Sequence, residues 1–553
     1  MSSISAQQFH IQSPIDFPIF LSGNFGELRS THFHAGIDIK TNGETGKTIR
    51  AIEQGYVSRV KIQTGGYGHA IYITHPNGYT SVYGHLNAFY PKLENYVRNQ
   101  QYLRKSFEVD LYLKSDQFLV GKGEMIGISG NTGQSGGPHL HLEIRDANQV
   151  PLNGLKYGLP IEDTIPPQLK NLVVYNDIDQ NTFMWKEKKI IPLRKINGSY
   201  SIDNPVDYEG FVAFGIEGYD YLNGSSNRCG IYSIDLFIDS SLYFAMQIDK
   251  FSFGETKYIK SYCDYEEKIV NSKSVHRLFI EPNNKLSIYK TPYNSGLYTA
   301  CNSTTSKVKM VTTDVYGNIS KIYFTILKKG NGSTETSIPE NVAEIDFSKD
   351  FKFEGDDYKF EILSNSLFAN KKMEYASYPS GQGFYSEFHI FGNENIPMAK
   401  FPKLKLKLTK SVEKINPEKL IIARFDTSGK ISSEGGAYNS GWVSANVTGF
   451  GKYAIVADTI KPEIKIVSFK NNGWYAANDM LLFKISDELS GIKTYNGYID
   501  GSWVLFEYDA KADNLFYKID PERITKSKNP HELKLFIMDE RNNVNSFTGK
   551  FYY

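Results

Sequence analysis

Two histidines stand two residues apart in the stretch GPHLHLEIRD, residues 137–146. Alternate side chains of a strand share a face, so a strand places His139 and His141 side by side, whereas a helix separates them. The apolar residues between them then form the opposite face. The stretch therefore predicts a strand with a core face of Leu140, Leu142 and Ile144 and a functional face of His139, His141, Glu143 and Arg145.

A second candidate strand lies upstream in HFHAGIDIK, residues 32–40. His34 and Asp38 are four positions apart and share one face, and Gly36 leaves space between them. His32 lies on the same face and could replace His34. This segment therefore predicts an imidazole and a carboxylate that point the same way.

A third candidate strand, TSVYGHLNAF at residues 80–89, contains one more histidine. Alternation predicts His85 on the same face as Ser81 and Tyr83, with Val82 and Leu86 on the other. Of the eleven histidines, eight lie in the first 141 residues, so chemistry based on imidazole belongs to the N-terminal part.

Two neutral imidazoles and one carboxylate form a zinc site with three protein ligands and one open position for water. Zinc in such a site polarises a carbonyl and lowers the pKa of the bound water to about 7. The candidate ligands are His34, Asp38 and one histidine of the HLH pair. The other histidine of that pair and His85 are candidates for proton transfer.

Simpler explanations exist for each residue. His139 and His141 alone could be exposed strand histidines, and His85 alone a hydrogen-bonded histidine beside a turn. His69 and His75 are expected at the surface or in turns, and Asn24 and Arg29 could line a groove. HELKL at residues 531–535 lacks the second histidine of the HExxH zinc motif, and GISGNTG lacks the GK[ST] of a phosphate-binding loop. The Asp-rich segments near residues 314 and 539 could bind calcium, but such segments more often form ordinary turns.

Three segments together resemble a known family. HFHAGID, GYGHAIYITHPNGYTSVYGHL and VGKGEMIGISGNTGQSGGPHLHLEI, in this order, resemble the lysostaphin/LytM-type zinc metallopeptidases, metallopeptidase family twenty-three. The resemblance covers roughly residues 15–150. It implies a mostly antiparallel β-sheet with an open groove, one zinc ion held by His34, Asp38 and His141, and His85 and His139 as catalytic histidines. It also implies hydrolysis of peptide bonds in the stems or cross-bridges of bacterial peptidoglycan.

One segment departs from the family pattern. In the family, a glycine-rich hairpin follows YGHL within about a dozen residues, whereas here residues 89–119 come first. We expect this insertion at the edge of the groove, where it would narrow access or add specificity.

The rest of the chain contains an internal repeat. DTIPPQLKNLVVYND at residue 163 resembles DTIKPEIKIVSFKNN at residue 458, and TTDVYGNISKIYFTI resembles IMDERNNVNSFTGKFYY. Short alternating strands separated by Asp, Asn and Gly turns are typical of Ig-like β-sandwiches. We therefore predict an all-β chain with a LytM-like domain at 1–162, two related sandwiches at 163–328 and 458–553, and a further β-sandwich module at 329–457 that begins with a polar linker.

The overall charge and hydrophobicity of the chain argue against several classes of function. The 553 residues carry a net charge of +1, which does not favour a nucleic-acid partner, and no apolar window is long enough to be a transmembrane segment. MSSISAQQFH resembles the end of a signal peptide whose front is missing, so we expect a periplasmic, envelope or secreted location. Cys229, Cys263 and Cys301 form no framework, although one pair could form a disulfide.

These observations lead to two hypotheses. The first is a zinc metalloendopeptidase that acts on peptidoglycan peptides, with β-modules that hold it near its polymer or near other envelope proteins. The alternative is a non-catalytic LytM-like scaffold that binds peptidoglycan or regulates another hydrolase. Every ligand position is filled, which favours the enzyme.

Overall fold

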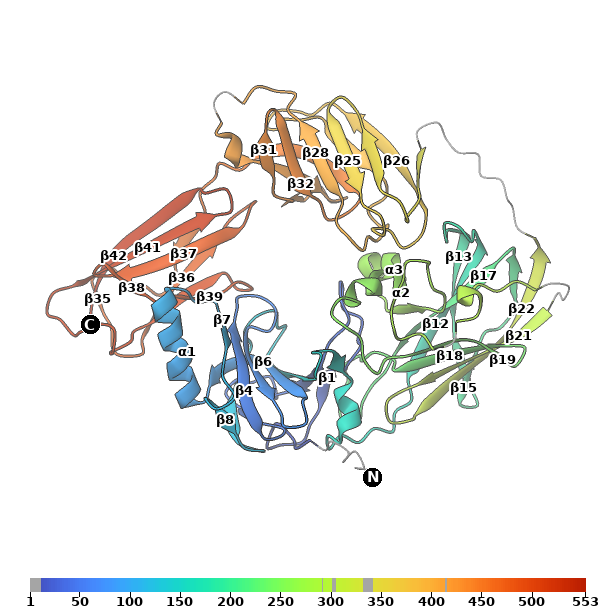
Figure 1. Cartoon of the computed structure of the whole chain (residues 1–553), viewed down its shortest axis with the longest axis horizontal. Coiled ribbons are helices and arrows are strands. Elements are labelled where there is room, and N and C mark those ends of the chain that lie inside the picture. Colours follow the sequence, from blue (N-terminus) through green and yellow to red (C-terminus); the bar gives the residue numbers. More distant parts are fainter. Residues whose placement is uncertain (1–10, 291, 301–304, 332–341, 413–414) are drawn as a thin grey trace.

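The computed structural model describes residues 11–290, 292–300, 305–331, 342–412 and 415–553. Its elements are almost all strands, so the prediction of an all-β chain is confirmed. Four β-rich modules follow one another around a ring, and the last returns to the first (Figure 1). Among the described residues, no helix has the length and apolar character needed to cross a bilayer. The signal-like start and Cys301 lie outside the described residues.

The first domain is built on an eleven-stranded antiparallel sheet with the order β1-β2-β10-β6-β5-β4-β7, to which β3, β8, β9 and β11 are attached. Its elements are β1 (Leu21–Gly23), β2 (Ile37–Lys40), β3 (Thr48–Arg50), β4 (Gly55–Ile62), β5 (His69–Thr74), β6 (Thr80–Phe89), α1 (Pro91–Arg104), β7 (Val109–Tyr112), β8 (Leu119–Val120), β9 (Met125–Ser129), β10 (His139–Arg145), β11 (Pro151–Leu152) and a 3₁₀ turn at Gly154–Tyr157. The central strand β10 lies between β2 and β6, which brings the three predicted segments together.

The predicted faces hold for β10 but not for β6. Leu140 and Leu142 of β10 pack in the core of the first domain. Tyr83 of β6 packs in the same core, while His85 lies with His139 on the opposite side of the sheet. The cause is a left-handed backbone at His85, with φ of 61°, where the pairing register with β5 shifts. Such a bulge inserts one residue and reverses the alternation.

The insertion at 89–119 also differs from expectation. It forms helix α1 and the edge strand β7, which lies at the end of the sheet far from β2. Helix α1 has Pro91 at its start and buries Leu93, Val97 and Gln101, a spacing of four residues that places them on one face. Another face of the helix contacts the fourth module, where the Tyr102 ring lies 5.5 Å from that of Trp503. The insertion lies beside His69, through Phe89 and Phe107, but its strand β7 is four strands away from β10.

The second module (residues 163–328) packs a four-stranded sheet, β13-β12-β17-β20, on a seven-stranded one that includes β15-β22-β21-β18-β19. Its elements are β12 (Gln168–Ile178), β13 (Trp185–Pro192), β14 (Arg194–Ile196), β15 (Ser199–Ser201), β16 (Val206–Glu209), β17 (Val212–Tyr219), β18 (Ser233–Ile238), β19 (Ser241–Gln247), α2 (Ile259–Tyr262), α3 (Tyr265–Asn271), β20 (Val275–Arg277), β21 (Thr305–Thr313) and β22 (Ile319–Gly330), with 3₁₀ turns at Thr256–Tyr258 and Asn294–Gly296. Cys229 and Cys263 are buried and free.

The third module (residues 329–457) pairs a six-stranded with a five-stranded sheet. Its elements are β23 (Val342–Ile345), β24 (Phe351–Glu354), β25 (Tyr358–Ile362), β26 (Lys371–Tyr378), β27 (Phe388–Phe391), β28 (Lys403–Lys407), a 3₁₀ turn at Pro417–Lys419, β29 (Leu420–Phe425), β30 (Ile431–Ser433), β31 (Ala437–Asn439), β32 (Trp442–Asn446) and β33 (Gly451–Ala457).

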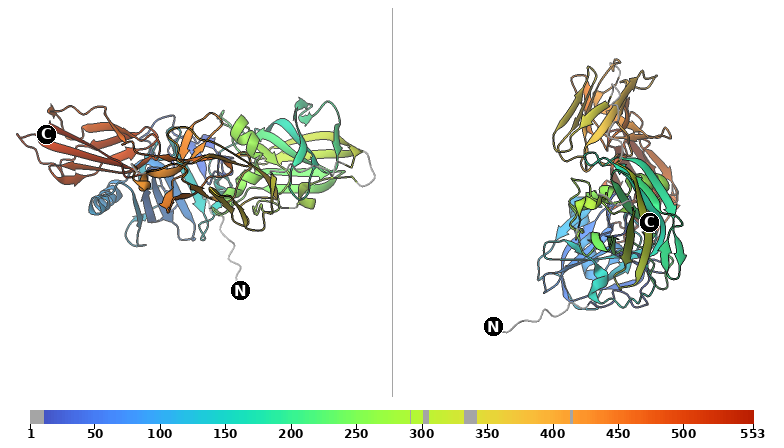
Figure 2. Two further views of the ribbon diagram at one scale, coloured as in Figure 1. Left: turned by 90° about the horizontal axis from the view of Figure 1, so that it is seen from above. Right: turned by 90° about the vertical axis from the view of Figure 1, so that its right-hand side faces the viewer.

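The fourth module (residues 458–553) pairs a four-stranded with a five-stranded sheet. Its elements are β34 (Glu463–Ile466), β35 (Gly473–Trp474), β36 (Met480–Ser486), β37 (Ile492–Ile499), β38 (Ser502–Val504), β39 (Glu507–Asp509), β40 (Asn514–Lys518), β41 (His531–Asp539) and β42 (Val544–Tyr552). It lies beside α1 in Figure 1 and in the left view of Figure 2. We propose the predicted boundaries as the module limits, with the end of the second module moved from 328 to 330 because β22 runs to Gly330.

Candidate metal centre

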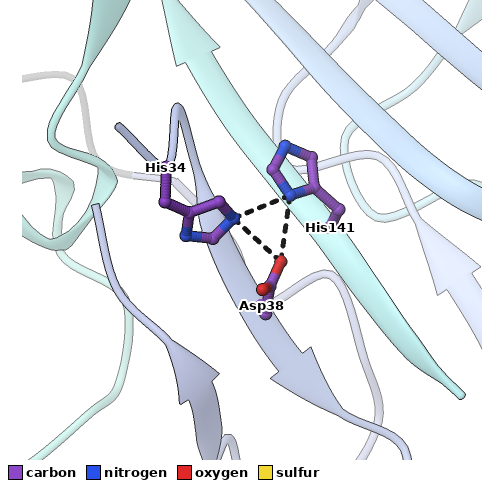
Figure 3. A group of neighbouring side chains, drawn as sticks. All are labelled: His34, Asp38 and His141. Carbon is purple, nitrogen blue, oxygen red and sulfur yellow. Dashed lines mark hydrogen bonds and ion pairs between the residues drawn. The ribbon is translucent and has the colours of Figure 1, made fainter. Parts of the chain in front are cut away.

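Three donor atoms from β10 and from the segment that leads into β2 converge on one point (Figure 3). His141 Nδ1 lies 2.9 Å from Asp38 Oδ1, His34 Nε2 lies 3.0 Å from the same oxygen, and the two nitrogens are 3.1 Å apart. Register explains part of this, because His141 pairs directly with Asp38 across β10 and β2. Strand β2 begins only at residue 37, so His34 reaches the centre from a bend and not from a continuous strand.

Gly36 makes room for this arrangement, as the sequence predicted. A Cβ atom at this position would lie 2.9 Å from His141 Cε1 and 2.9 Å from Glu143 Cγ. Both distances are shorter than a side-chain carbon can approach another carbon without a clash. The glycine therefore lets the β10 side chains cross over the bend that carries His34.

The second nitrogen of each histidine is held by a hydrogen bond. His34 Nδ1 donates to the carbonyl of Asn24 at 2.8 Å, and His141 Nε2 donates to Glu143 Oε1 at 2.9 Å. With these nitrogens protonated, His34 Nε2 and His141 Nδ1 face Asp38 with lone pairs. Partners of this kind orient and polarise the histidine ligands of metal sites.

The Glu143 carboxylate is itself fully paired. It accepts hydrogen bonds from the Tyr67 hydroxyl at 2.5 Å and from Arg145 Nε at 2.7 Å. Burial opposes its charge, but Arg145 and His141 outweigh burial and lower the pKa of Glu143 to about 2. The sequence analysis placed Glu143 on the functional face of the strand but assigned it no role. Its position two residues after His141, on the same face, could have indicated a partner for that histidine.

The electrostatics of the three donor residues fit a cation. Burial opposes the charged form of Asp38, but His34, His139 and His141 hold its pKa well below the usual range. Burial likewise opposes a charged His141 ring, yet hydrogen bonds with Asp38 and Glu143 raise the pKa of His141 to about 9. The site thus favours positive charge at its centre.

The spacing of the donors also fits zinc. Zinc–nitrogen bonds of about 2.0–2.1 Å in a tetrahedron place neighbouring ligands about 3.3 Å apart. The observed separations of 2.9–3.1 Å are close to this value. Zinc could therefore be held by His34, Asp38 and His141 with little movement of their side chains. Mg²⁺, which prefers oxygen ligands, is a poorer match for a site with two imidazoles.

Two further histidines lie beside this centre. The His85 and His139 rings are 4.7 Å apart, and His139 Nε2 lies 3.4 Å from Asp38 Oδ1. Each ring binds a backbone carbonyl through Nδ1, His85 that of Thr132 and His139 that of Gly137, both at 2.8 Å. With Nδ1 protonated, Nε2 is the nitrogen of each ring that can accept a proton. Burial and the neighbouring His141 and His139 lower the pKa of His85 to about 3, so its ring is neutral at pH 7.

Other candidates from the sequence lie elsewhere. His32 is exposed and is not one of the three converging donors. His69 is buried in β5, so its expected position at the surface or in a turn is wrong, and its ring lies 6.0 Å from that of Phe107. His75 is also buried, but it opens a turn in which its carbonyl accepts the N–H of Gly78, and its ring binds the Ser81 hydroxyl. Arg29 does reach the centre, since its Nη2 lies 2.8 Å from Asp38 Oδ2.

The loop that carries His34 is anchored in the second module. Phe25, Leu28, Phe33 and Ala35 belong to the core of that module, not to the core of the first domain. Asn24, expected to line the groove, instead exchanges two buried hydrogen bonds with Gly230 at 2.7 and 2.8 Å. The second module therefore positions one of the three donor residues.

Comparison with known proteins agrees with this geometry. Residues 32–109 match the model of peptidase family M23, and residues 343–458 match that of the Zu5-like domain. The DD-carboxypeptidase/endopeptidase Mpg of Neisseria meningitidis serogroup B is 35% identical over 133 residues, 24% of this chain and 24% of that relative. The peptidoglycan DD-endopeptidase ShyA of Vibrio cholerae serotype O1 is 34% identical over 80 residues, 14% and 18% of the two chains.

A solved structure, a zinc containing peptidase from Vibrio cholerae, is 26% identical, covers 27% of this chain and 39% of that chain, and gives a TM-score of 0.20. The chain thus spans about a quarter of the length of the curated relative Mpg. The family match at 32–109 includes His34, Asp38 and His85 and ends before His139. The N-terminal part of this chain is therefore a domain of peptidase family M23, of the LytM type, and β-rich modules follow it, of which the one at 329–457 matches the Zu5-like domain.

Proposed function

We propose that this protein is a zinc-dependent metalloendopeptidase that hydrolyses peptide bonds in bacterial peptidoglycan. The observation that carries the proposal is the convergence of His34 Nε2, Asp38 Oδ1 and His141 Nδ1 within 3.1 Å of one another. The peptidoglycan endopeptidase name of a relative supports the substrate class. A location outside the cytoplasm, in the periplasm, the envelope or the medium, follows from that substrate.

Bound by His34, Asp38 and His141, zinc would supply a Lewis acid for the scissile carbonyl and a water with a pKa near 7. The protein's own groups provide the proton transfer. His85 and His139 have Nδ1 fixed by backbone carbonyls, so each can accept a proton at Nε2 and later donate it to the leaving amine. The same nitrogens, once protonated, can stabilise the oxyanion of the tetrahedral intermediate.

Digestion of purified sacculi by the full chain tests this proposal, with mass spectrometry of the released peptides and measurement of zinc per chain. The wild type should bind one zinc ion and release peptides with new amino termini. His141→Ala should lose both properties, and His32→Ala, at the exposed neighbouring histidine, should keep both.

His85→Asn separates zinc binding from proton transfer. Asparagine tolerates the left-handed backbone at this position, so the variant should fold and bind zinc. We expect release of peptides to fall about 100-fold or more. Zinc bound and the fold intact, but no release by the wild type, would favour the alternative of a non-catalytic scaffold. Unchanged release by His85→Asn would contradict the assigned role of His85.

A further inference from the structure

The two repeated modules each contain a cluster of three aspartates at equivalent places. Asp163, Asp220 and Asp314 form one cluster, and Asp458, Asp487 and Asp539 form the other. In each cluster, one oxygen per carboxylate lies within 4.8 Å of the other two. The first aspartate precedes β12 or β34 by five residues, and the second directly follows β17 or β36. The third directly follows β21 in the second module and is the last residue of β41 in the fourth. The repeat has therefore kept the cluster in both copies.

Hydrogen bonds shape the two clusters in the same way. Asp314 Oδ1 accepts the backbone N–H of Asn318, whose amide nitrogen donates to Asp314 Oδ2 and to the Asp163 carbonyl. In the fourth module, Asn543 makes the same three bonds, to both oxygens of Asp539 and to the carbonyl of Asp458. These turns hold the carboxylates in place without neutralising them.

Three of the carboxylates keep a buried oxygen with no hydrogen-bond partner. These oxygens are Asp163 Oδ2, Asp220 Oδ1 and Asp458 Oδ2. Their residues are 9%, 4% and 3% exposed, so water does not solvate them freely. Such groups are costly unless a partner is bound. The unpartnered oxygens occur in both copies of the cluster, which points to a ligand and not to ordinary turn geometry.

Within the described parts of the chain, these carboxylates lack a compensating cation. Among the described residues, no Lys, Arg or His forms an ion pair with any of the six aspartates. Burial, followed by the charges of Asp314 and Asp163, raises the pKa of Asp220 to about 8. Burial and the neighbouring aspartates also raise the pKa of Asp458, although its hydrogen bond with Ser490 opposes them. Both clusters are therefore deficient in positive charge.

We propose that each repeated module binds one Ca²⁺ ion, held by Asp163, Asp220 and Asp314 in the second module and by Asp458, Asp487 and Asp539 in the fourth. Carboxylate oxygens from loops suit a hard cation that accepts irregular geometry, which favours Ca²⁺ over Mg²⁺ and over zinc. Water and backbone carbonyls complete the coordination. Binding stabilises both modules.

The position of the two sites gives the ions a structural role at module junctions. Beside the first site, Leu222 belongs to the core of the first domain, and Tyr316 packs against that core. Beside the second site, Leu489 packs against the third module, and the carbonyl of Arg541 accepts a hydrogen bond from Lys419 of that module. In both repeats, loops that supply ligands also contact the preceding module, so each ion fixes the angle at a junction.

Calorimetric titration with CaCl₂ tests the proposal on the full chain, dialysed against a chelator and then loaded with one equivalent of zinc. The wild type should bind two Ca²⁺ per chain. Asp220→Asn and Asp487→Asn should each bind one, and the double variant none. Asp203→Asn, at an exposed ion pair of the second module, is the matched control and should still bind two.

Thermal unfolding provides the second readout. Saturating Ca²⁺ should raise the unfolding temperature of the wild type by about 5 °C and leave that of the double variant unchanged. Without Ca²⁺, each Asp→Asn change removes like-charge repulsion, so the variants should be at least as stable as the wild type. Absence of calcium binding, or equal binding by wild type and double variant, would overturn the proposal.

Discussion

The second and fourth modules, which contain the sequence repeat, contact the first domain in different ways. The second module takes Phe25, Leu28 and Phe33 of the first domain into its own core, and Phe25 stacks on Phe251 at 4.8 Å. The fourth module meets helix α1 through polar and aromatic contacts and places one residue, Leu505, in the core of the first domain. Examples are the ion pair of Arg98 with Asp520 at 3.4 Å and the Arg523 guanidinium over the Tyr102 ring at 4.2 Å.

The second module therefore helps to position the metal centre, whereas the fourth module completes the ring of modules. Asn24 and Phe33 flank the loop that carries His34, and both are held by the second module. The fourth module reaches the site only indirectly. Lys511 donates to the carbonyl of Asn131, beside the Thr132 carbonyl that holds His85. We therefore expect substitutions at the contact with the second module to alter zinc binding. Substitutions at the contact with the fourth module should alter the overall shape of the molecule.

Phe33→Ala should have the largest effect. Phe33 is 2% exposed and packs on Phe251 and Tyr262, so its truncation should cost about 3–5 kcal/mol of stability and weaken zinc binding at His34. Denaturant unfolding and zinc titration measure the two effects. Phe483→Ala, in the core of the fourth module, should cost a similar amount and leave zinc affinity unchanged. Equal zinc affinities in both variants would refute the assignment.

Asn24→Ala should have the next largest effect. It leaves the buried N–H and C=O of Gly230 without partners, which should cost about 2–3 kcal/mol, and it loosens the carbonyl that orients His34. Asn283→Ala is the matched control, because the Asn283 amide bonds two carbonyls of the third module far from the metal centre. Only Asn24→Ala should release zinc more readily to a chelator. A similar release from Asn283→Ala would mean that general loosening is the cause.

Docking of the fourth module on α1 should weaken as pH rises. Burial raises the pKa of Glu507 to about 7, opposed by Arg98 and Lys518 and assisted by Glu94. A carboxyl whose pKa is raised on docking favours the docked state at low pH, and this contribution is lost as pH rises through 7. Between pH 6 and 8 the docking constant should fall about tenfold, or about 1.4 kcal/mol.

Small-angle scattering should show this change as a larger radius of gyration at pH 8 than at pH 6. Glu507→Gln should remove most of the pH dependence while keeping the compact form. A wild type whose dimensions do not change with pH would show that Glu507 stays neutral or that other contacts hold the ring closed.

Arg523→Ala should have the smallest effect. It removes an exposed cation–π contact with Tyr102 and a hydrogen bond to Asn99 at 3.0 Å, together worth about 0.5–1 kcal/mol. Scattering should show slight opening, and peptide release from sacculi should stay within about twofold of the wild type. A large loss of peptide release would mean that ring closure is part of the active state.

The sequence predicted the features that depend on local pattern. Alternation in β10 gave both faces correctly, and the HxxxD and HxH spacings singled out residues that lie together. Helix α1 was missed because its apolar face is narrow, although Pro91 and the Leu93–Val97 spacing were a usable signal. The predicted face of His85 was wrong because a single residue with left-handed backbone reverses the alternation of the strand. No local sequence pattern indicates such a residue.

The contacts between modules could not be predicted at all. Asn24 and Gly230 are 206 positions apart, and neither residue type indicates a buried pair. The Asp-rich turns illustrate the opposite case. Each looked like ordinary turn chemistry alone, and only the fold showed that three distant aspartates meet in both repeats.

The anchoring of the His34 loop in the second module also sets an order of events during synthesis. A ribosome that adds about 5–20 residues per second needs about 10–40 s to travel the 206 positions from Asn24 to Gly230. Through this interval the sheet of the first domain can form, but the loop that carries His34 lacks its partner. The newly made N-terminal domain therefore emerges with an incomplete metal centre, which matures only when the second module folds against it.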